Sequence, residues 1–167
     1  MTKLFAQPYN TGATGFYFES AESYERQAEG RKDAHGQKVE EFEIQFMEGE
    51  GIDEELFEAL GVTQARIEQY FEAVEEWSDD EKTRVIIAVG ECGAVFGPDS
   101  RPDDYEVTVY EMDSLKDLAK QFVEDGHYGE IPEQLRPYLD MNAIARDLGA
   151  EYSETRIAGR NYVYWCR

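Results

Sequence analysis

The sequence predicts an α+β protein with short strands towards both ends and helices between them. Apolar and polar residues alternate near both termini, as in residues 41–47, and this period of two is typical of half-buried strands. In the middle, apolar residues recur every three or four positions, as in amphipathic helices. At 167 residues, the chain is long enough for one ordinary domain or for two or three small lobes.

Residues 1–52 are predicted to form a small α+β lobe. We expect strands over residues 3–9, 15–19 and 41–47, the second of them rich in aromatic residues. Ser20 stands where a helix N-cap belongs, before a helix over residues 21–27 that Gly30 stops.

Residues 53–103 are predicted to form an acidic helical lobe. A short helix begins at Ile52 or Asp53 and closes at Gly61, and Thr63 is a suitable N-cap for a second helix. The apolar face of the second helix follows helical spacing, with Ile67, Tyr70, Phe71, Val74 and Trp77.

A third helical segment follows in the same lobe. Ser78 opens it, with carboxylates in the first turn where the helix dipole favours them. Residues 84–89 suit a helix or a buried strand, and we interpret them as helix. Residues 90–104 contain three glycines and two prolines and are interpreted as an irregular connection.

Residues 104–167 are predicted to form a lobe of three antiparallel strands with helices. A strand over residues 105–112 precedes a helix that starts with a capping-box-like pair, Ser114 and Asp117, and ends at Gly126. Further helices are expected over residues 132–138 and 141–148, the latter capped by Asp140. Residues 152–157 and 161–165 flank a short turn, which is a hairpin signature.

Negative charge is concentrated in one quarter of the chain. Residues 40–81 hold sixteen carboxylates and a single base, Arg66, a net charge of −15 out of −21 for the whole chain. Adaptation to high salt would spread acids throughout the sequence. An ordinary solvated face remains an alternative, but solubility requires a net charge of only about 2 to 8 in magnitude.

The composition argues against several classes of protein and partner. A pI near 4.3 argues against direct binding to nucleic acid or to an anionic membrane, because phosphate groups are bound by clusters of Lys and Arg. No apolar run approaches the length of a membrane span, and the N-terminal residues lack a secretory signal pattern. Cys92 and Cys166 have no metal-binding or redox spacing, so we expect two free thiols in a cytoplasmic protein.

No residue pattern identifies an active site. His35 and His127 each lie beside a glycine without Cys or His partners at ligand spacing, and Cys92 has no identifiable base. Among 37 acids some carboxylate pairs are inevitable, so a pair by itself does not indicate a hydrolase. We therefore expect no catalysis, no cofactor and no specific metal site.

A rigid face of carboxylates can imitate the backbone of DNA. B-DNA carries one negative charge per roughly 1.7 Å of axis, and DNA-binding proteins gain much of their affinity by neutralising those charges. A helix presents about one acid per turn over residues 68–79, which is sparser than a phosphate strand. A mimic would therefore need several elements, or two copies of the chain.

The C-terminal half contains three distinctive segments: residues 113–115, DSL, at the start of a helix, the run GEIPEQLRPYLD over residues 129–140, and AIARDL over residues 143–148. In these segments the chain resembles the ArdA-type antirestriction proteins of plasmids, transposons and phages. Residues 9–12 and the strand at 40–46 are similar more loosely.

This resemblance implies an elongated, three-lobed protein that forms a curved homodimer. It also implies that the acidic surface imitates bent DNA, occupies the DNA-binding groove of type I restriction–modification enzymes and inhibits them without catalysis. We assign the GEIPEQLRPYLD segment to structure and dimerisation, because its apolar residues have core or interface spacing; these are Ile131, Leu135, Tyr138 and Leu139.

The candidate target-binding residues are acids expected on the surface of the helices and just beyond them. They are Glu54, Glu55, Glu58, Glu68, Glu72, Glu75, Glu76, Asp79, Asp80, Glu81, Asp103, Asp104 and Glu106. The alternatives are an acidic adaptor that binds another basic DNA-binding or defence protein without strict mimicry, and a hydrolase or metal-dependent enzyme with converging acids.

Overall fold

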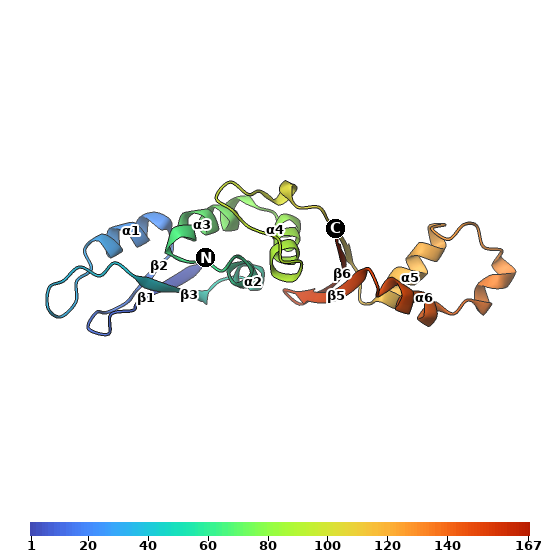
Figure 1. The fold of residues 1–167 in the computed structure, drawn as a ribbon, viewed down its shortest axis with the longest axis horizontal. Coiled ribbons are helices and arrows are strands. Elements are labelled where there is room, and N and C mark those ends of the chain that lie inside the picture. The colour runs from blue at the N-terminus through green and yellow to red at the C-terminus, as the bar shows by residue number, and fades with distance from the viewer. The chain divides into compact units, whose positions relative to one another are not determined.

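The computed structural model describes residues 1–167 and contains two compact units, Met1–Tyr105 and Glu106–Arg167 (Figure 1). Each unit holds a three-stranded antiparallel sheet and helices, so the predicted α+β fold class is confirmed. The further division of the first unit at residue 52 stays a prediction. No helix of the protein is long and apolar enough to cross a membrane.

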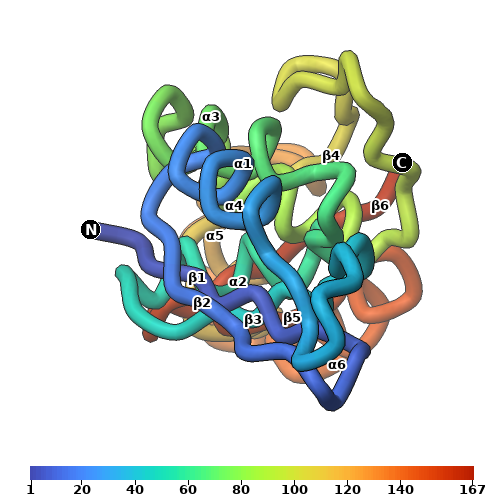
Figure 2. The backbone as a smooth tube through the Cα atoms, turned by 90° about the vertical axis from the view of Figure 1, so that its left-hand side faces the viewer, coloured from blue at the N-terminus to red at the C-terminus, as the bar shows by residue number.

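The sheet of the first unit has the strand order β2-β1-β3, and its strands run side by side in Figure 2. The strands are β1 (Lys3–Pro8), β2 (Phe16–Phe18) and β3 (Phe42–Glu48). β1 is central, and Leu4 pairs with Phe18 on one side and with Phe46 on the other.

One face of this sheet is covered by helices (Figure 1). The α1 helix (Ala21–Glu29) begins at Ser20, whose hydroxyl accepts a hydrogen bond from the Ser23 N–H at 3.0 Å. The ring of Tyr24 on α1 lies 5.1 Å from that of Phe18, and Phe71 lies 6.0 Å from Phe18. The aromatic residues of the N-terminal strands therefore form the core beneath the helices.

The acidic part of the sequence forms α2 (Gly51–Leu60), α3 (Ile67–Glu76) and α4 (Asp79–Val85), as predicted. Gly61 ends α2 in the left-handed conformation, with φ 58°. The second helix differs from the prediction at its start, because residues Gln64–Arg66 form a 3₁₀ turn, η1, and the Thr63 side chain makes no capping bond.

Residues 84–89 are helical, which confirms the interpretation from the sequence, but most of this helix has an unusual geometry. After α4 the chain continues as a π-helix, η2 (Ile86–Glu91), with Ile86, Ile87 and Ala88 buried. The connection that follows is irregular, as predicted, apart from the 3₁₀ turn η3 (Pro102–Asp104).

The second unit has the sheet order β4-β6-β5, which confirms the predicted three-stranded antiparallel arrangement. Its strands are β4 (Val107–Glu111), β5 (Tyr152–Ile157) and β6 (Arg160–Cys166). β5 and β6 form the predicted hairpin, in which Ala158 and Gly159 have φ angles of 49° and 80°. Two consecutive positive φ angles are those of a type I′ turn.

The helices of the second unit are α5 (Leu115–Glu124) and α6 (Met141–Leu148). Leu118 and Phe122 of α5 pack with Tyr152 and Val163 of the sheet to form a small core. Between α5 and α6, the predicted helix at residues 132–138 is instead a 3₁₀ helix, η4 (Glu133–Tyr138), and Pro132 precedes it. Pro137 lacks an N–H, so a regular α-helix is disfavoured there.

The expectation of two free thiols is wrong, because the structure leaves neither cysteine free. Sequence spacing could not reveal this, since it reports local motifs and carries no information on thiols that lie far apart in the chain.

Candidate target-binding surface

Most of the predicted target-binding acids are exposed to solvent. Eleven of the thirteen are in the exposed class, and Glu55 and Glu81 are half-buried. Twelve of them lie in the first unit, on α2, α3, α4 and η3, whereas Glu106 is the first residue of the second unit. The structure therefore groups the acids of three helices and one turn in a single compact unit.

The arrangement on α3 follows directly from its sequence. Ile67, Tyr70 and Phe71 are buried, and the periodicity of 3.6 residues turns the intervening positions outward. The carboxylates at those outward positions are Glu68, Glu72, Glu75 and Glu76.

The first turn of α4 uses one carboxylate for its own structure. Glu81 accepts a hydrogen bond from the Ser78 N–H at 2.8 Å, and the Ser78 hydroxyl accepts one from the Glu81 N–H at 3.2 Å. This capping box leaves Asp79 and Asp80 exposed to solvent. In the same way, Asp104 accepts a hydrogen bond from the Arg101 N–H at 2.8 Å in η3.

One acid of the charged stretch is not on the surface at all. Asp53 is 4% exposed, and its Oδ1 lies 2.8 Å from Lys82 Nζ. Its backbone carbonyl also accepts a hydrogen bond from the Tyr70 hydroxyl at 2.7 Å. Asp53 therefore links α2 to α3 and α4, and it contributes no negative charge to the acidic surface.

The bases of these helices do not neutralise the exposed acids. Arg66 donates to the Leu60 carbonyl at 2.8 Å and to the Phe96 carbonyl at 2.9 Å, and Lys82 is paired with buried Asp53. Arg84 donates to the Tyr105 carbonyl at 3.4 Å. No ion pair involves the exposed acids Glu54, Glu58, Glu68, Glu72, Glu75, Glu76, Asp79 or Asp80.

The apolar residues of the GEIPEQLRPYLD segment are not buried within the chain. Tyr138 is 85% exposed and Leu135 54% exposed, while Ile131 and Leu139 are half-buried. The neighbouring helix α6 also contains no buried residue. Core spacing in this segment therefore does not correspond to a core within one copy of the chain.

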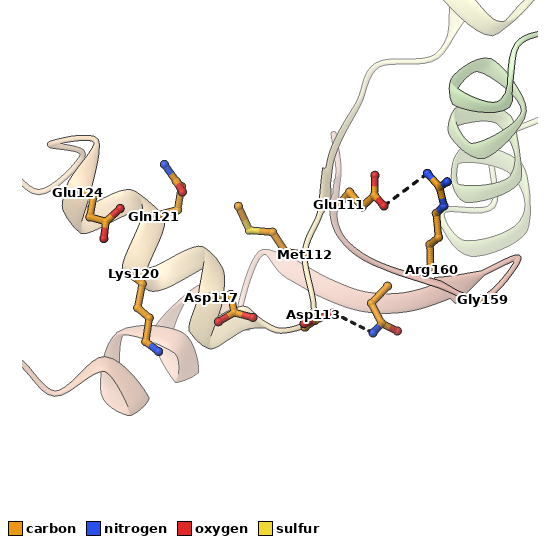
Figure 3. Close-up of a pocket in the computed structure, with 10 residues that line it drawn as sticks. Glu111, Met112, Asp113, Asp117, Lys120, Gln121, Glu124, Gly159 and Arg160 are labelled. Atoms are coloured by element: carbon orange, nitrogen blue, oxygen red, sulfur yellow. Dashed lines mark hydrogen bonds and ion pairs between the residues drawn. The ribbon is translucent and has the colours of Figure 1, made fainter.

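A hollow in the second unit has a volume of about 660 Å³ and is lined by side chains of both signs of charge (Figure 3). Glu111 pairs with Arg160 at 3.5 Å, and the Asn161 amide donates to Asp113 at 3.1 Å. Lys120 lines the same hollow. The protein has no group of three or more His, Cys, Asp or Glu residues that could hold a metal ion.

The two histidines, His35 and His127, lie outside the acidic helices α2, α3 and α4. The His35 N–H donates to Asp33 at 2.8 Å in an exposed turn. The His127 ring stacks on Phe122 at 4.1 Å, just after the end of α5. Neither arrangement supplies a nucleophile or a second base.

The sequence did not predict which polar side chains connect the acidic helices to one another and to the segment after η2. Arg66, Gln69 and Lys82 hold the helices and the connection after η2 in place through their side chains. Arg66 did carry a signal, because it is the single base among residues 40–81. A lone base in such a stretch points to a structural role.

The first of the two α+β units therefore presents exposed carboxylates on α2, α3 and α4 that form no ion pairs. The family model of the antirestriction protein (ArdA) family matches residues 9–162, and the chain therefore belongs to that family. The resemblance noted in the sequence is thereby confirmed. No curated protein sequence matches the chain.

Proposed function

We propose that this antirestriction protein inhibits type I restriction–modification enzymes by occupying the DNA-binding groove of their methyltransferase core. In this proposal the exposed carboxylates of the first unit stand in for DNA phosphates, and inhibition requires no catalysis. The positive groove that attracts DNA attracts the acidic surface for the same electrostatic reason.

The main support for this proposal is that the exposed acids of α2, α3 and α4 form no ion pairs. Bases near exposed acids would reduce the field that a distant partner feels. Here Arg66 and Lys82 are both directed into the protein, towards backbone carbonyls and towards Asp53. The field of the exposed acids is therefore available to a partner.

The spacing of the acids supports a surface made from several elements. Along one α-helix, four residues rise about 6 Å, whereas phosphates follow one another every 3.4 Å or so along each DNA strand. Acids from α2 and α4, and from η3, supplement those of α3 within the same unit. The proposed phosphate surrogates are the thirteen acids named from the sequence, with Glu81 and Asp104 weakened by their capping bonds.

We also propose that the protein acts as a homodimer. Isolated exposed apolar residues are normal on a protein surface, but contiguous apolar patches mark contact surfaces. Leu135 and Tyr138 are exposed in η4, and the next element, α6, contains no fully buried residue. A second copy of the chain is the partner that we infer for this segment.

The proposal is tested by removing charge from α3 without changing its shape. We expect the Glu68→Gln, Glu72→Gln, Glu75→Gln and Glu76→Gln variant, with all four changes, to lose affinity for the methyltransferase core by at least about tenfold at low salt. A competition assay against labelled duplex DNA measures this loss.

The matched control removes four carboxylates elsewhere, as Glu22→Gln, Glu25→Gln, Glu29→Gln and Glu124→Gln, all of them exposed. Equal losses in the two variants would show that net charge alone matters and would contradict a localised mimic. If the wild-type protein binds a basic partner that duplex DNA does not displace, the adaptor alternative replaces the proposal.

A further inference from the structure

A groove lies between α3 and the connection that follows η2, and three carboxylates are among the residues that line it. It has a volume of about 430 Å³. Figure 1 shows this connection returning towards α3 after η2. Residues from both sides line the groove, and those used below are Glu72, Glu76, Trp77, Asp99 and Arg101.

Hydrogen bonds hold the two walls of the groove together. The Gln69 side-chain amide donates to the carbonyls of Gly97 at 2.7 Å and Pro98 at 3.1 Å. The Gly97 N–H donates to the Ser100 hydroxyl at 2.9 Å, and Arg66 fixes the Phe96 carbonyl. The groove is therefore formed before any partner arrives.

The groove combines carboxylates with an aromatic ring. Glu72 and Glu76 are one helical turn apart on α3, and Asp99 stands on the connection. No ion pair involves any of the three. Trp77 is half-buried, and its ring meets the ring of Phe96 edge-on at a centroid distance of 6.1 Å.

We propose that this groove receives an arginine side chain of the target protein. A guanidinium is planar, stacks on aromatic faces and forms paired hydrogen bonds with carboxylates, and the groove offers both kinds of partner. Lysine lacks the planar fork, so it fits the same set of groups less well. The inference rests on the proposed function for the identity of the target, which would be the restriction enzyme.

The groove would give the inhibitor an aromatic contact for arginine that the phosphate backbone of DNA lacks. A phosphate backbone attracts arginine by charge and hydrogen bonds, but it presents no indole ring. An arginine held by Trp77 as well as by carboxylates distinguishes one basic groove from another, whereas the wider acidic surface attracts all of them.

Arg101 also lines the groove and is the one base that does so. Its side chain is exposed and forms no ion pair with Glu72, Glu76 or Asp99. The Arg101→Ala variant should therefore bind an external guanidinium at least as tightly as the wild-type protein does.

The first test uses N-acetyl-arginine amide as the probe, at physiological salt. We expect a saturable shift of the Trp77 indole N–H resonance in the full chain, with Trp165 as an internal reference, and a weaker response to N-acetyl-lysine amide. The Glu72→Gln/Glu76→Gln variant should lose the shift, and the Glu22→Gln/Glu25→Gln variant should keep it. A shift that does not saturate, or that is equal in both variants, overturns the proposal.

The second test separates this inference from the proposed function. The Trp77→Leu variant keeps every charge, and its fold is checked by the dispersion of its amide resonances. We expect it to compete with DNA for the methyltransferase core about fivefold less well than the wild type, a loss of the size of a cation–π contact. If the wild type competes and folded Trp77→Leu competes equally, the arginine groove is wrong and the charge mimic stands. If the wild type does not compete, the proposed function fails and the probe titration still decides the groove.

Discussion

Asp53 and Lys82 form an ion pair in which only 6% of each side chain is exposed. Two charges taken out of water lose their hydration, and their mutual attraction compensates for this only while both are present. The Thr2 hydroxyl lies 3.5 Å from the second carboxylate oxygen, which brings the N-terminal strand region into the same cluster.

Removing one member of this pair should be more harmful than removing both. We expect Lys82→Met to lower the free energy of unfolding by about 3–5 kcal/mol, because Asp53 is left buried without a partner. The double variant Asp53→Asn/Lys82→Met should recover much of that loss. Urea unfolding measures both variants, with Arg101→Met as the control for an exposed base. A double variant as unstable as the single one contradicts this account.

Tyr70 makes the stability of the first unit sensitive to alkaline pH. Burial raises the pKa of the Tyr70 phenol well above its ordinary value near 10, and the nearby charges of Asp53 and Glu54 raise it further. The folded state therefore disfavours the ionised form. The stability that the neutral phenol provides is complete below about pH 10 and is lost as the pH rises beyond it, because the unfolded chain then releases the proton.

We expect the Tyr70→Phe variant to lose less stability than the wild type between pH 9 and pH 11 or so. At neutral pH it should be less stable by about 1 kcal/mol, because the hydrogen bond to the Asp53 carbonyl is missing. Thermal unfolding across this pH range tests the prediction. Burial also raises the pKa of Tyr24 and of Tyr152, so part of the alkaline loss should remain. Identical pH profiles for the two proteins would rule out the assigned role.

The elements of the first unit act on a partner as sets of charges. Neighbouring exposed acids on α3 stand about one turn apart, a rise of roughly 5 to 6 Å, which is within the Debye length of about 8 Å at physiological salt. The potential at any point above the helix is therefore a sum over several groups, and no single group dominates it.

A single charge removal on α3 should consequently have little effect on inhibition. We expect Glu72→Gln to weaken binding to the methyltransferase core by less than about threefold, and Glu75→Gln to behave in the same way. Competition with labelled duplex DNA measures both. Loss of inhibition by Glu72→Gln alone would point to a local site in place of a shared field.

Local signals in the sequence predicted most of the elements. The N-caps at Ser20, Ser78, Ser114 and Asp140 are confirmed, because a cap depends on residues within a few positions of it. The 3₁₀ turn η1 and the π-helix η2 were not predicted. Gln64 in η1 donates to the Glu40 carbonyl at 2.9 Å, a contact that is distant in the sequence.

The candidate site was predictable in its charge but less so in its detail. Exposure of Glu68, Glu72 and Glu75 followed from the helical period of α3. The burial of Asp53 did not, because its partner Lys82 lies 29 residues away and on a different helix. Sequence spacing likewise did not identify the Leu60 and Phe96 carbonyls as the partners of Arg66.

The two units of the whole molecule differ in charge and in what they expose. The first has 25 acids and 9 bases, a net charge of −16, and the second has 12 acids and 7 bases, a net charge of −5. The second instead exposes the apolar segment around η4. This division matches the two proposed roles, target binding by the first unit and self-association by the second.

Charges placed in the exposed apolar segment should break the proposed homodimer. We expect the Leu135→Asp/Tyr138→Asp variant to sediment as a monomer at concentrations where the wild type is a dimer, with an unchanged far-ultraviolet circular dichroism spectrum. Burying two carboxylates in a contact surface is unfavourable, whereas both positions are exposed in one copy. Tyr17→Asp, at an exposed tyrosine of β2, is the control. A wild-type protein that is monomeric at all concentrations contradicts the homodimer.

The most direct test of phosphate mimicry is the displacement of DNA at two salt concentrations. The protein is titrated into a type I methyltransferase core bound to labelled duplex DNA, at low salt and at physiological salt. Phosphate mimicry predicts stoichiometric displacement of DNA, with an affinity for the core that falls steeply as salt rises, as DNA binding itself does. No displacement at either salt, or a complex whose affinity does not change with salt, would contradict it.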